Sequence, residues 1–90
     1  MFYVYILHSE LDNKLYTGYT GDLERRISEH SSGKVASTKD RRPLKLIYYE
    51  AYLSEEDAKG RELFLKSGSG KNYLKKQLQH YFRENPWKIK

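Results

Sequence analysis

Five polar side chains in this sequence are of types that together suit chemistry on a phosphate ester. Tyr5 and Tyr16 fall in two separate runs of strand-forming residues, and Arg26 and His30 are one helical turn apart. Glu62 falls in a later helical pattern. A deprotonated tyrosine or an imidazole can take up a proton, a guanidinium fits a phosphate as a fork, and a carboxylate can hold a divalent cation. Such chemistry is possible only if the fold brings these residues together.

The two tyrosines lie on a predicted hairpin. Residues 2–8 and 15–19 are rich in aromatic and β-branched residues, and the polar residues 12–14 between them are typical of a turn. Both faces of the first strand are largely apolar, which favours a central strand covered on both sides. Gly18 in the second strand allows a close approach by a neighbouring group or a ligand. His8, at the end of the first strand, is expected at the surface.

A short helix is predicted directly after the hairpin. Asp22 is a good N-cap, and Leu23, Ile27 and His30 recur along one face. Arg26 flanks the same face, so Arg26 and His30 are expected to project towards the sheet, where an unpaired charge is costly. Each residue also has a purely structural interpretation, because an arginine can keep its charged end in water and a histidine can be satisfied by hydrogen bonds.

The rest of the chain predicts one further strand and two further helices. Residues 31–43 form a polar loop with little reason to pack, and residues 44–52 have the composition of a third strand. Ser54, followed by three acidic residues, begins a helix that is expected to break at residues 67–70. The last helix is expected to end at Asn85–Pro86, with Trp87 folding back onto the body.

These elements predict an α+β fold. A three-stranded, mainly antiparallel sheet is flanked by three helices, in the order β-β-α-β-α-α. We expect residues 1–84 to form a single domain and residues 85–90 a short C-terminal tail. On the helix after the third strand, Glu62 lies in the same stripe as Ala58 and Leu65. A carboxylate in a core-facing stripe indicates either an ion pair with Arg26 or a functional role.

Composition narrows the classes of function. The formal net charge is +5 and the isoelectric point is about 9.4, which suits a polyanionic partner, although a merely soluble basic surface is the alternative. The absence of cysteine excludes disulfides, thiolate chemistry and cysteine-based zinc sites. No apolar run approaches the ~20 residues of a membrane span, and no signal-peptide pattern is present. We therefore expect a cytoplasmic protein with no membrane partner.

Two groups of basic residues are candidates for phosphate contacts. One follows the first helix and the other lies in the C-terminal third of the chain, where basic residues far outnumber acidic ones. Together with Gly18, which allows close approach of a backbone, they form the predicted nucleic-acid-binding set: Lys34, Lys39, Arg41, Arg42, Lys71 and Lys75.

The five polar residues match the needs of phosphodiester hydrolysis. Water must be activated for in-line attack, and the charge that develops on the phosphate must be neutralised. Glu62 suffices to hold one Mg²⁺ ion that keeps most of its waters, and Arg26 can clamp a phosphate oxygen. A tyrosine or His30 can serve as general base. Which of Tyr5 and Tyr16 would act is left open by the sequence.

In this order the motifs resemble those of the GIY-YIG nuclease superfamily, over nearly the whole chain. Residues 3–5 read Tyr-Val-Tyr and residues 16–18 read Tyr-Thr-Gly, followed by the arginine, the histidine and the glutamate. The chain looks most like the small stand-alone bacterial members of the YhbQ-like group. By this resemblance Tyr5 is the last residue of the first motif and Tyr16 is the first residue of the second. The implied catalytic set is Tyr5, Tyr16, Arg26, His30 and Glu62, with Glu62 as the metal ligand.

The resemblance implies a divalent-metal-dependent endonuclease that hydrolyses phosphodiester bonds in DNA. A single Mg²⁺ or Mn²⁺ ion, and a role in DNA repair or in the processing of structured or single-stranded DNA, are further implications. RNA is an alternative substrate, and a monomer or weak homodimer is expected. The alternative function is a basic nucleic-acid-binding module that does not cleave, because 90 residues barely exceed a catalytic core.

Overall fold

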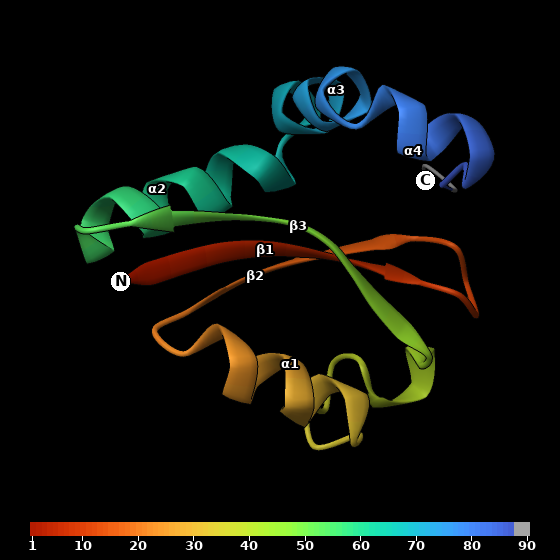
Figure 1. Cartoon of the computed structure of the whole chain (residues 1–90), viewed down its shortest axis with the longest axis horizontal. Helices are drawn as coiled ribbons and strands as arrows, with labels where there is room; N and C mark the ends of the chain where they lie inside the picture. The colour runs from red at the N-terminus through yellow and green to blue at the C-terminus, as the bar shows by residue number, and fades with distance from the viewer. Residues whose placement is uncertain (88–90) are drawn as a thin grey trace.

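The centre of the molecule is a three-stranded antiparallel sheet in the order β2-β1-β3 (Figure 1). The computed structural model describes residues 1–87. Its strands are β1 (Phe2–Ser9), β2 (Leu15–Thr20) and β3 (Leu44–Tyr52). The hairpin and the central position of the first strand, both predicted from the sequence, are confirmed.

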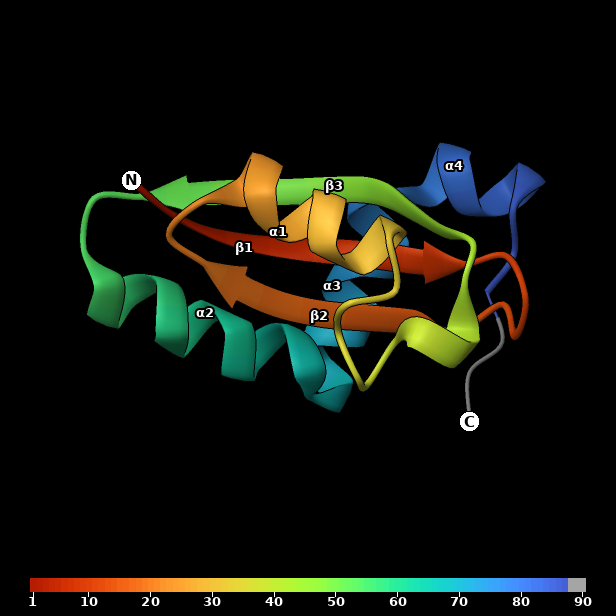
Figure 2. The same ribbon diagram turned by 90° about the horizontal axis from the view of Figure 1, so that it is seen from below.

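Helices cover both faces of this sheet. Figure 2 shows the first helix crossing one face, with the second helix alongside β2 and the third helix behind the sheet. In chain order the helical segments are α1 (Leu23–Ser31), the short 3-10 helix η1 (Lys39–Arg41), α2 (Glu55–Lys66), α3 (Gly68–Gln77) and α4 (Gln79–Glu84). The α+β class is therefore confirmed, and within residues 1–87 no helix has the length and apolar character needed to cross a bilayer.

The C-terminal helical region differs in detail from the predicted break at residues 67–70 followed by one last helix. Ser67 ends α2, and its hydroxyl accepts a hydrogen bond from the backbone N–H of Gly70, so it also caps α3. The two helices therefore follow each other without a loop. A further break at Leu78, where the backbone leaves helical geometry, separates α3 from α4. The order in the described chain is thus β-β-α-β-α-α-α.

The two faces of β1 have different roles. Val4 and Ile6 point to the side of α2 and α3 and form the apolar core, together with Ala58, Leu65 and Leu74. The opposite face carries Tyr3, Tyr5 and Leu7 and is covered by α1. Trp87 packs against Phe82 with ring centroids 4.4 Å apart, as expected, while residues 88–90 of the predicted tail lie outside the described residues.

Two local expectations are wrong. His8 is 5% exposed rather than at the surface, because its ring nitrogens bond to the hydroxyl of Tyr81 and the side chain of Asn13. The loop after α1 also packs. Val35 and Thr38 are buried, and the loop folds against α1 through a hydrogen bond from the N–H of Lys34 to the last turn of the helix. This packing places a loop residue in the candidate site.

Candidate active site

The pairing of β1 with β2 places Tyr5 directly across from Gly18. The ring of Tyr5 lies over this glycine. A Cβ atom at position 18 would lie 2.8 Å from Cε2 of Tyr5 and closer still to Cζ and Oη, which is nearer than a real Cβ atom comes. Gly18 is therefore required by the ring of Tyr5, and the glycine that the sequence analysis assigned to close approach accommodates a side chain of the protein itself.

Tyr5 is the first member of a buried hydrogen-bonded chain. Its hydroxyl lies 2.8 Å from Nε2 of His30, and Nδ1 of His30 lies 2.7 Å from Oγ1 of Thr38. Tyr5 and His30 are each 1% exposed. Since both ring nitrogens have a partner, His30 is fully satisfied and holds strand, helix and loop together.

The local structure of α1 explains how His30 and Arg26 reach this place. The side chain of Asp22 accepts a hydrogen bond from the N–H of Arg25 and so starts the helix. His30 lies two turns further along the helix and is buried. Arg26 lies one turn before His30, is half-buried, and is beside Tyr5. The guanidinium of Arg26 is 3.0 Å from Glu29, which also binds Arg25 at 2.7 Å.

The electrostatics of the buried groups follow from desolvation. Burial raises the pKa of Tyr5 to about 12, even though the neighbouring Arg26 acts in the opposite direction. Burial lowers the pKa of His30, and the positive charge of Arg26 lowers it further. Tyr5 therefore stays a protonated phenol and His30 a neutral imidazole at neutral pH.

Tyr16 is the more accessible of the two candidate tyrosines. It is half-buried, and its ring centroid lies 5.1 Å from that of His30 and 6.4 Å from that of Tyr5. The three rings form one cluster on the α1 side of the sheet. Tyr16 is thus held by the buried pair and still reaches solvent, which Tyr5 does not.

Glu62 lies on α2, which packs against β1 and β2. Its side chain is 21% exposed, and its carboxylate lies 3.2 Å from Nζ of Lys66. Its negative charge contributes to the raised pKa of Tyr5, so the acid lies within electrostatic reach of the phenol. The ion pair between Glu62 and Arg26 that a structural interpretation would require is not formed, because Arg26 pairs with Glu29.

The residues present fit a metal site with few protein ligands. Within residues 1–87, no three side chains of His, Asp or Glu gather closely enough to hold a metal ion. A Mg²⁺ ion that keeps most of its waters needs only one or two carboxylates, and the partly exposed carboxylate of Glu62 can provide one. Lys66, which is half-exposed, is able to move aside.

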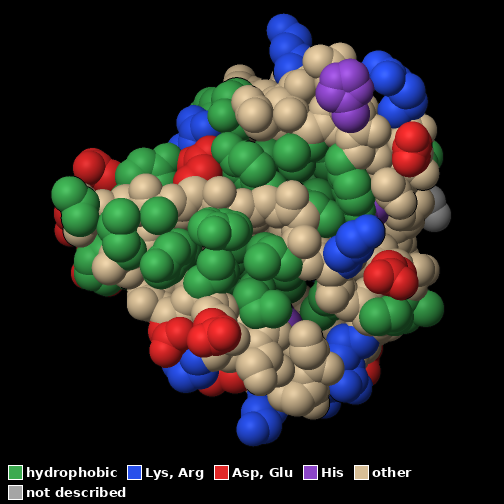
Figure 3. All heavy atoms as spheres, viewed as in Figure 1, with side chains coloured by type: hydrophobic (Ala, Val, Ile, Leu, Met, Phe, Trp, Pro, Cys, Tyr) green, Lys and Arg blue, Asp and Glu red, His purple; other side chains and the backbone are tan. Residues whose placement is uncertain are grey.

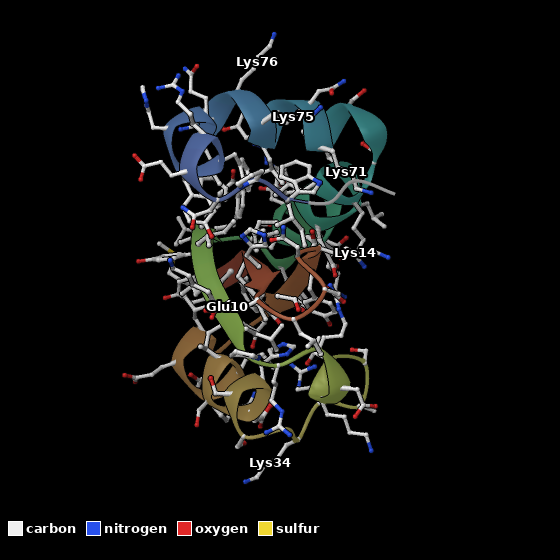
Figure 4. The ribbon with its side chains drawn as sticks, turned by 90° about the vertical axis from the view of Figure 1, so that its right-hand side faces the viewer. Glu10, Lys14, Lys34, Lys71, Lys75 and Lys76 are labelled. Atoms are coloured by element: carbon white, nitrogen blue, oxygen red, sulfur yellow. The ribbon has the colours of Figure 1, made fainter. Side chains whose placement is uncertain are left out.

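The predicted basic residues do not form one surface. Figure 4 shows Lys71 and Lys75 at the α3 end of the molecule and Lys34 at the opposite end, beyond α1. Lys39 is exposed on η1. The fold therefore separates the two basic groups by the full thickness of the sheet and its helices.

The two remaining basic residues of the set are engaged within the protein. Nε of Arg41 binds Asp12 at 2.7 Å and joins η1 to the hairpin turn, which lowers the pKa of Asp12 to about 2. Nε of Arg42 donates to the backbone carbonyl of Lys39. Both contacts indicate a structural contribution from side chains predicted to bind phosphate.

Thr38 is the site residue that the sequence analysis missed. It comes eight residues after His30, in a segment assigned to an unpacked loop, and no periodicity links the two. Its only signal is that a buried histidine needs a second partner for its ring.

Comparison with known proteins agrees with this arrangement. The model of the GIY-YIG catalytic domain matches residues 1–79, which include every residue of the candidate site. The chain belongs to the GIY-YIG family. This membership indicates a nuclease-type hydrolase with a nucleic-acid substrate and confirms the resemblance seen in the sequence.

Curated relatives and a solved structure support the same membership. A UPF0213 protein of Staphylococcus haemolyticus is 47% identical over 74 residues, covering 81% of this chain and 89% of the relative. A UPF0213 protein of Pediococcus acidilactici is 43% identical over 77 residues, covering 82% and 78%. The solution NMR structure of a UPF0213 protein from Bacillus halodurans has a TM-score of 0.52 at 42% identity, covering 82% of each chain. This GIY-YIG chain is thus similar to small bacterial proteins of nearly its own length.

Proposed function

We propose that this GIY-YIG protein is a divalent-metal-dependent endonuclease that hydrolyses phosphodiester bonds in DNA. The observation that carries the proposal is the meeting of Arg26 and Tyr16 with the Tyr5–His30 pair, within electrostatic reach of Glu62. A cation, a proton acceptor and a carboxylate are the groups that in-line attack on a phosphodiester uses. A role in repair, acting on structured or single-stranded DNA, is part of the same proposal.

Arg26 is proposed to bind a non-bridging oxygen of the scissile phosphate. Its guanidinium is half-buried on α1, and its ion pair with Glu29 fixes its direction while leaving other N–H donors of the fork free for a ligand. Because its charge faces the aromatic cluster, it would neutralise charge that develops on the phosphate. Its neighbour Arg25, which is exposed, provides a matched control.

Tyr16 is proposed to take the proton from the attacking water. Of the two candidate tyrosines it is the one that reaches solvent, whereas the hydroxyl of Tyr5 is enclosed and bonded to His30. Tyr5 and His30 are then positioning residues that hold the ring of Tyr16 in place. Tyr16 can act in this way only as the phenolate, which takes the proton from water and becomes the phenol.

Glu62 is proposed to hold the metal ion. When bound, such an ion supplies Lewis-acid stabilisation of the phosphate and of the leaving oxygen. The residues of the chain contribute position: Glu62 fixes the site, and Arg26 orients the phosphate relative to Tyr16.

The test is a nicking assay on supercoiled plasmid DNA with Mg²⁺ or Mn²⁺ and with excess EDTA. We expect nicking that needs the metal, and a loss of 100-fold or more in Glu62→Gln, Arg26→Ala and Tyr16→Phe, by the general cost of removing such groups (~10²–10⁴-fold). Tyr5→Phe should retain more activity than Tyr16→Phe. An RNA strand of the same sequence is incubated with the protein in parallel, and the ratio of the two cleavage rates measures the preference for DNA.

Matched controls separate a site effect from a surface effect. Glu56→Gln changes an exposed carboxylate on the same helix as Glu62, and Arg25→Ala changes the neighbour of Arg26; both should nick at the rate of the wild type. A folded wild type that binds DNA but nicks no faster than Glu62→Gln would contradict the proposal and favour the non-cleaving binding module.

A further inference from the structure

A cavity of about 570 Å³ lies on the α1 side of the sheet and has no part in the mechanism above. It is bounded by the first turns of α1 and by strands β1 and β3. Its walls include Tyr3, Leu23, Glu24, Ile27, Leu46 and Tyr49. Its volume is in the range of sites that hold small organic groups.

The wall of this cavity exposes an aromatic ring. Tyr49 is 53% exposed, and its ring meets that of Tyr3 edge-to-face, with centroids 6.1 Å apart. Figure 3 shows hydrophobic side chains gathered over the face in front of β3, with acidic side chains along its lower rim. An exposed aromatic surface of this kind marks a place where a partner group binds.

The cavity adjoins the candidate active site. Tyr49 pairs with Tyr5 across β1 and β3. Tyr3 is two residues before Tyr5 and shares its face of the strand, and Ile27 follows Arg26 on α1. The opening of the cavity therefore lies next to the arginine that is proposed to bind the phosphate.

We propose that the cavity receives one unstacked base of the substrate strand, next to the phosphate that is cut. This inference rests on the proposed function. Aromatic rings such as Tyr3 and Tyr49 stack on any base, and the apolar side chains of Leu46 and Ile27 cover its remaining surface. The carboxylates of Asp22 and Glu24 at the edge accept hydrogen bonds from base N–H groups and repel phosphate, so a base rather than the backbone fits the cavity.

The experiment compares two single strands of equal length and charge. One is a labelled deoxyadenosine oligonucleotide of about twelve nucleotides, and the other is the same backbone with abasic sites throughout. Both are titrated in EDTA, so that the strand stays intact. We expect Tyr49→Leu, which keeps apolar bulk but removes the ring, to weaken binding of the base-bearing strand roughly 5- to 100-fold. Binding of the abasic strand should not change.

Controls use the same two strands. Tyr49→Phe should bind as the wild type does, because the ring is retained, and so should Phe64→Leu, an exposed aromatic on α2 outside the cavity. Equal weakening of both strands in Tyr49→Leu, or none, would overturn the inference. So would a dimer in sedimentation that Tyr49→Leu disrupts without changing base-dependent binding, because the surface would then join two copies of the chain.

The outcome is separable from that of the nicking assay. If the protein nicks DNA in a metal-dependent way but binds the base-bearing and abasic strands equally, the cavity does not bind a base and the nuclease proposal stands. Base-dependent binding that Tyr49→Leu abolishes, in a protein that does not nick DNA, would remove the nuclease proposal alone.

Discussion

The hydroxyl of Tyr5 on β1 lies 2.8 Å from Nε2 of His30 on α1, and both side chains are withdrawn from solvent. This contact joins residues that are 25 positions apart. Through Thr38 on the other side of the imidazole, it also fixes the loop that follows α1. The accessible ring of Tyr16 packs against this buried pair, so the geometry of the candidate site depends on hydrogen bonds that are closed off from solvent.

Thr38→Val should destabilise the protein by roughly 1–3 kcal/mol, the cost of leaving a buried polar nitrogen without a partner. Valine has nearly the shape of threonine and removes only the hydroxyl that bonds Nδ1 of His30. Urea unfolding followed by circular dichroism measures the effect. Thr38→Ser keeps the hydroxyl and should recover most of the loss; equal losses in Val and Ser would show that packing, not the hydrogen bond, is what matters.

Stability should fall as the pH falls below about 6.5, through His30. Its pKa in the folded protein lies below the ordinary value, so at mildly acidic pH the unfolded chain binds a proton that the folded chain does not. The contribution of neutral His30 to the free energy of unfolding is then fully present above the pKa that His30 has in the unfolded chain. It decreases as the pH falls towards the pKa that His30 has in the folded protein. Urea midpoints at pH 7.5 and 5.0 test this.

The matched variants for the pH effect are His30→Gln and His80→Gln. Gln at position 30 has no charge to gain, so the fall in midpoint between pH 7.5 and 5.0 should shrink. His80 is exposed on α4, and its replacement should leave the wild-type fall unchanged. A fall of the same size in His30→Gln would place the proton uptake elsewhere.

The sequence predicts those parts of the site that periodicity and turn chemistry determine. Although the register that sets Tyr5 opposite Gly18 is seen only in the structure, the hairpin that puts Tyr5 and Gly18 on adjacent strands, and the helix face that carries His30, follow from local patterns. Thr38 does not, because a hydrogen bond between a helix and a loop has no period. The separation of Lys34 from Lys71 also could not be predicted, since charge along a chain does not say which side of the sheet each helix covers.

Gly18→Ala should destabilise the protein by roughly 1–3 kcal/mol, as overpacking in a buried region does. The added methyl group would displace the ring of Tyr5 and with it the bond to His30. Gly60→Ala is a control for which the expected change in stability has the opposite sign. This glycine lies inside α2 with open space around it, so alanine should stabilise by about 1 kcal/mol through helix propensity. Thermal or urea unfolding that moves both variants in the same direction would contradict the steric argument.

The residue before Glu62 on α2 is tied to the sheet. Arg61 forms a two-pronged ion pair with Glu50 of β3, with distances of 2.9 and 3.0 Å, and the same carboxylate accepts hydrogen bonds from Tyr48 and Tyr52. Burial acts to raise the pKa of Glu50, but Arg61 and the two tyrosines outweigh it and the pKa is lowered. This clamp joins α2 to β3 one residue before Glu62.

Arg61→Lys should raise the Mg²⁺ concentration needed for half-maximal nicking and lower the maximal rate by up to about 100-fold, because lysine keeps the charge but cannot form the fork that fixes α2. Unfolding should become easier by roughly 1–3 kcal/mol. Lys59→Gln, which alters an exposed ion pair on the same helix, should change neither quantity. If Arg61→Lys loses stability but keeps the wild-type response to Mg²⁺ at a temperature where both proteins are folded, the clamp supports the fold and does not orient Glu62.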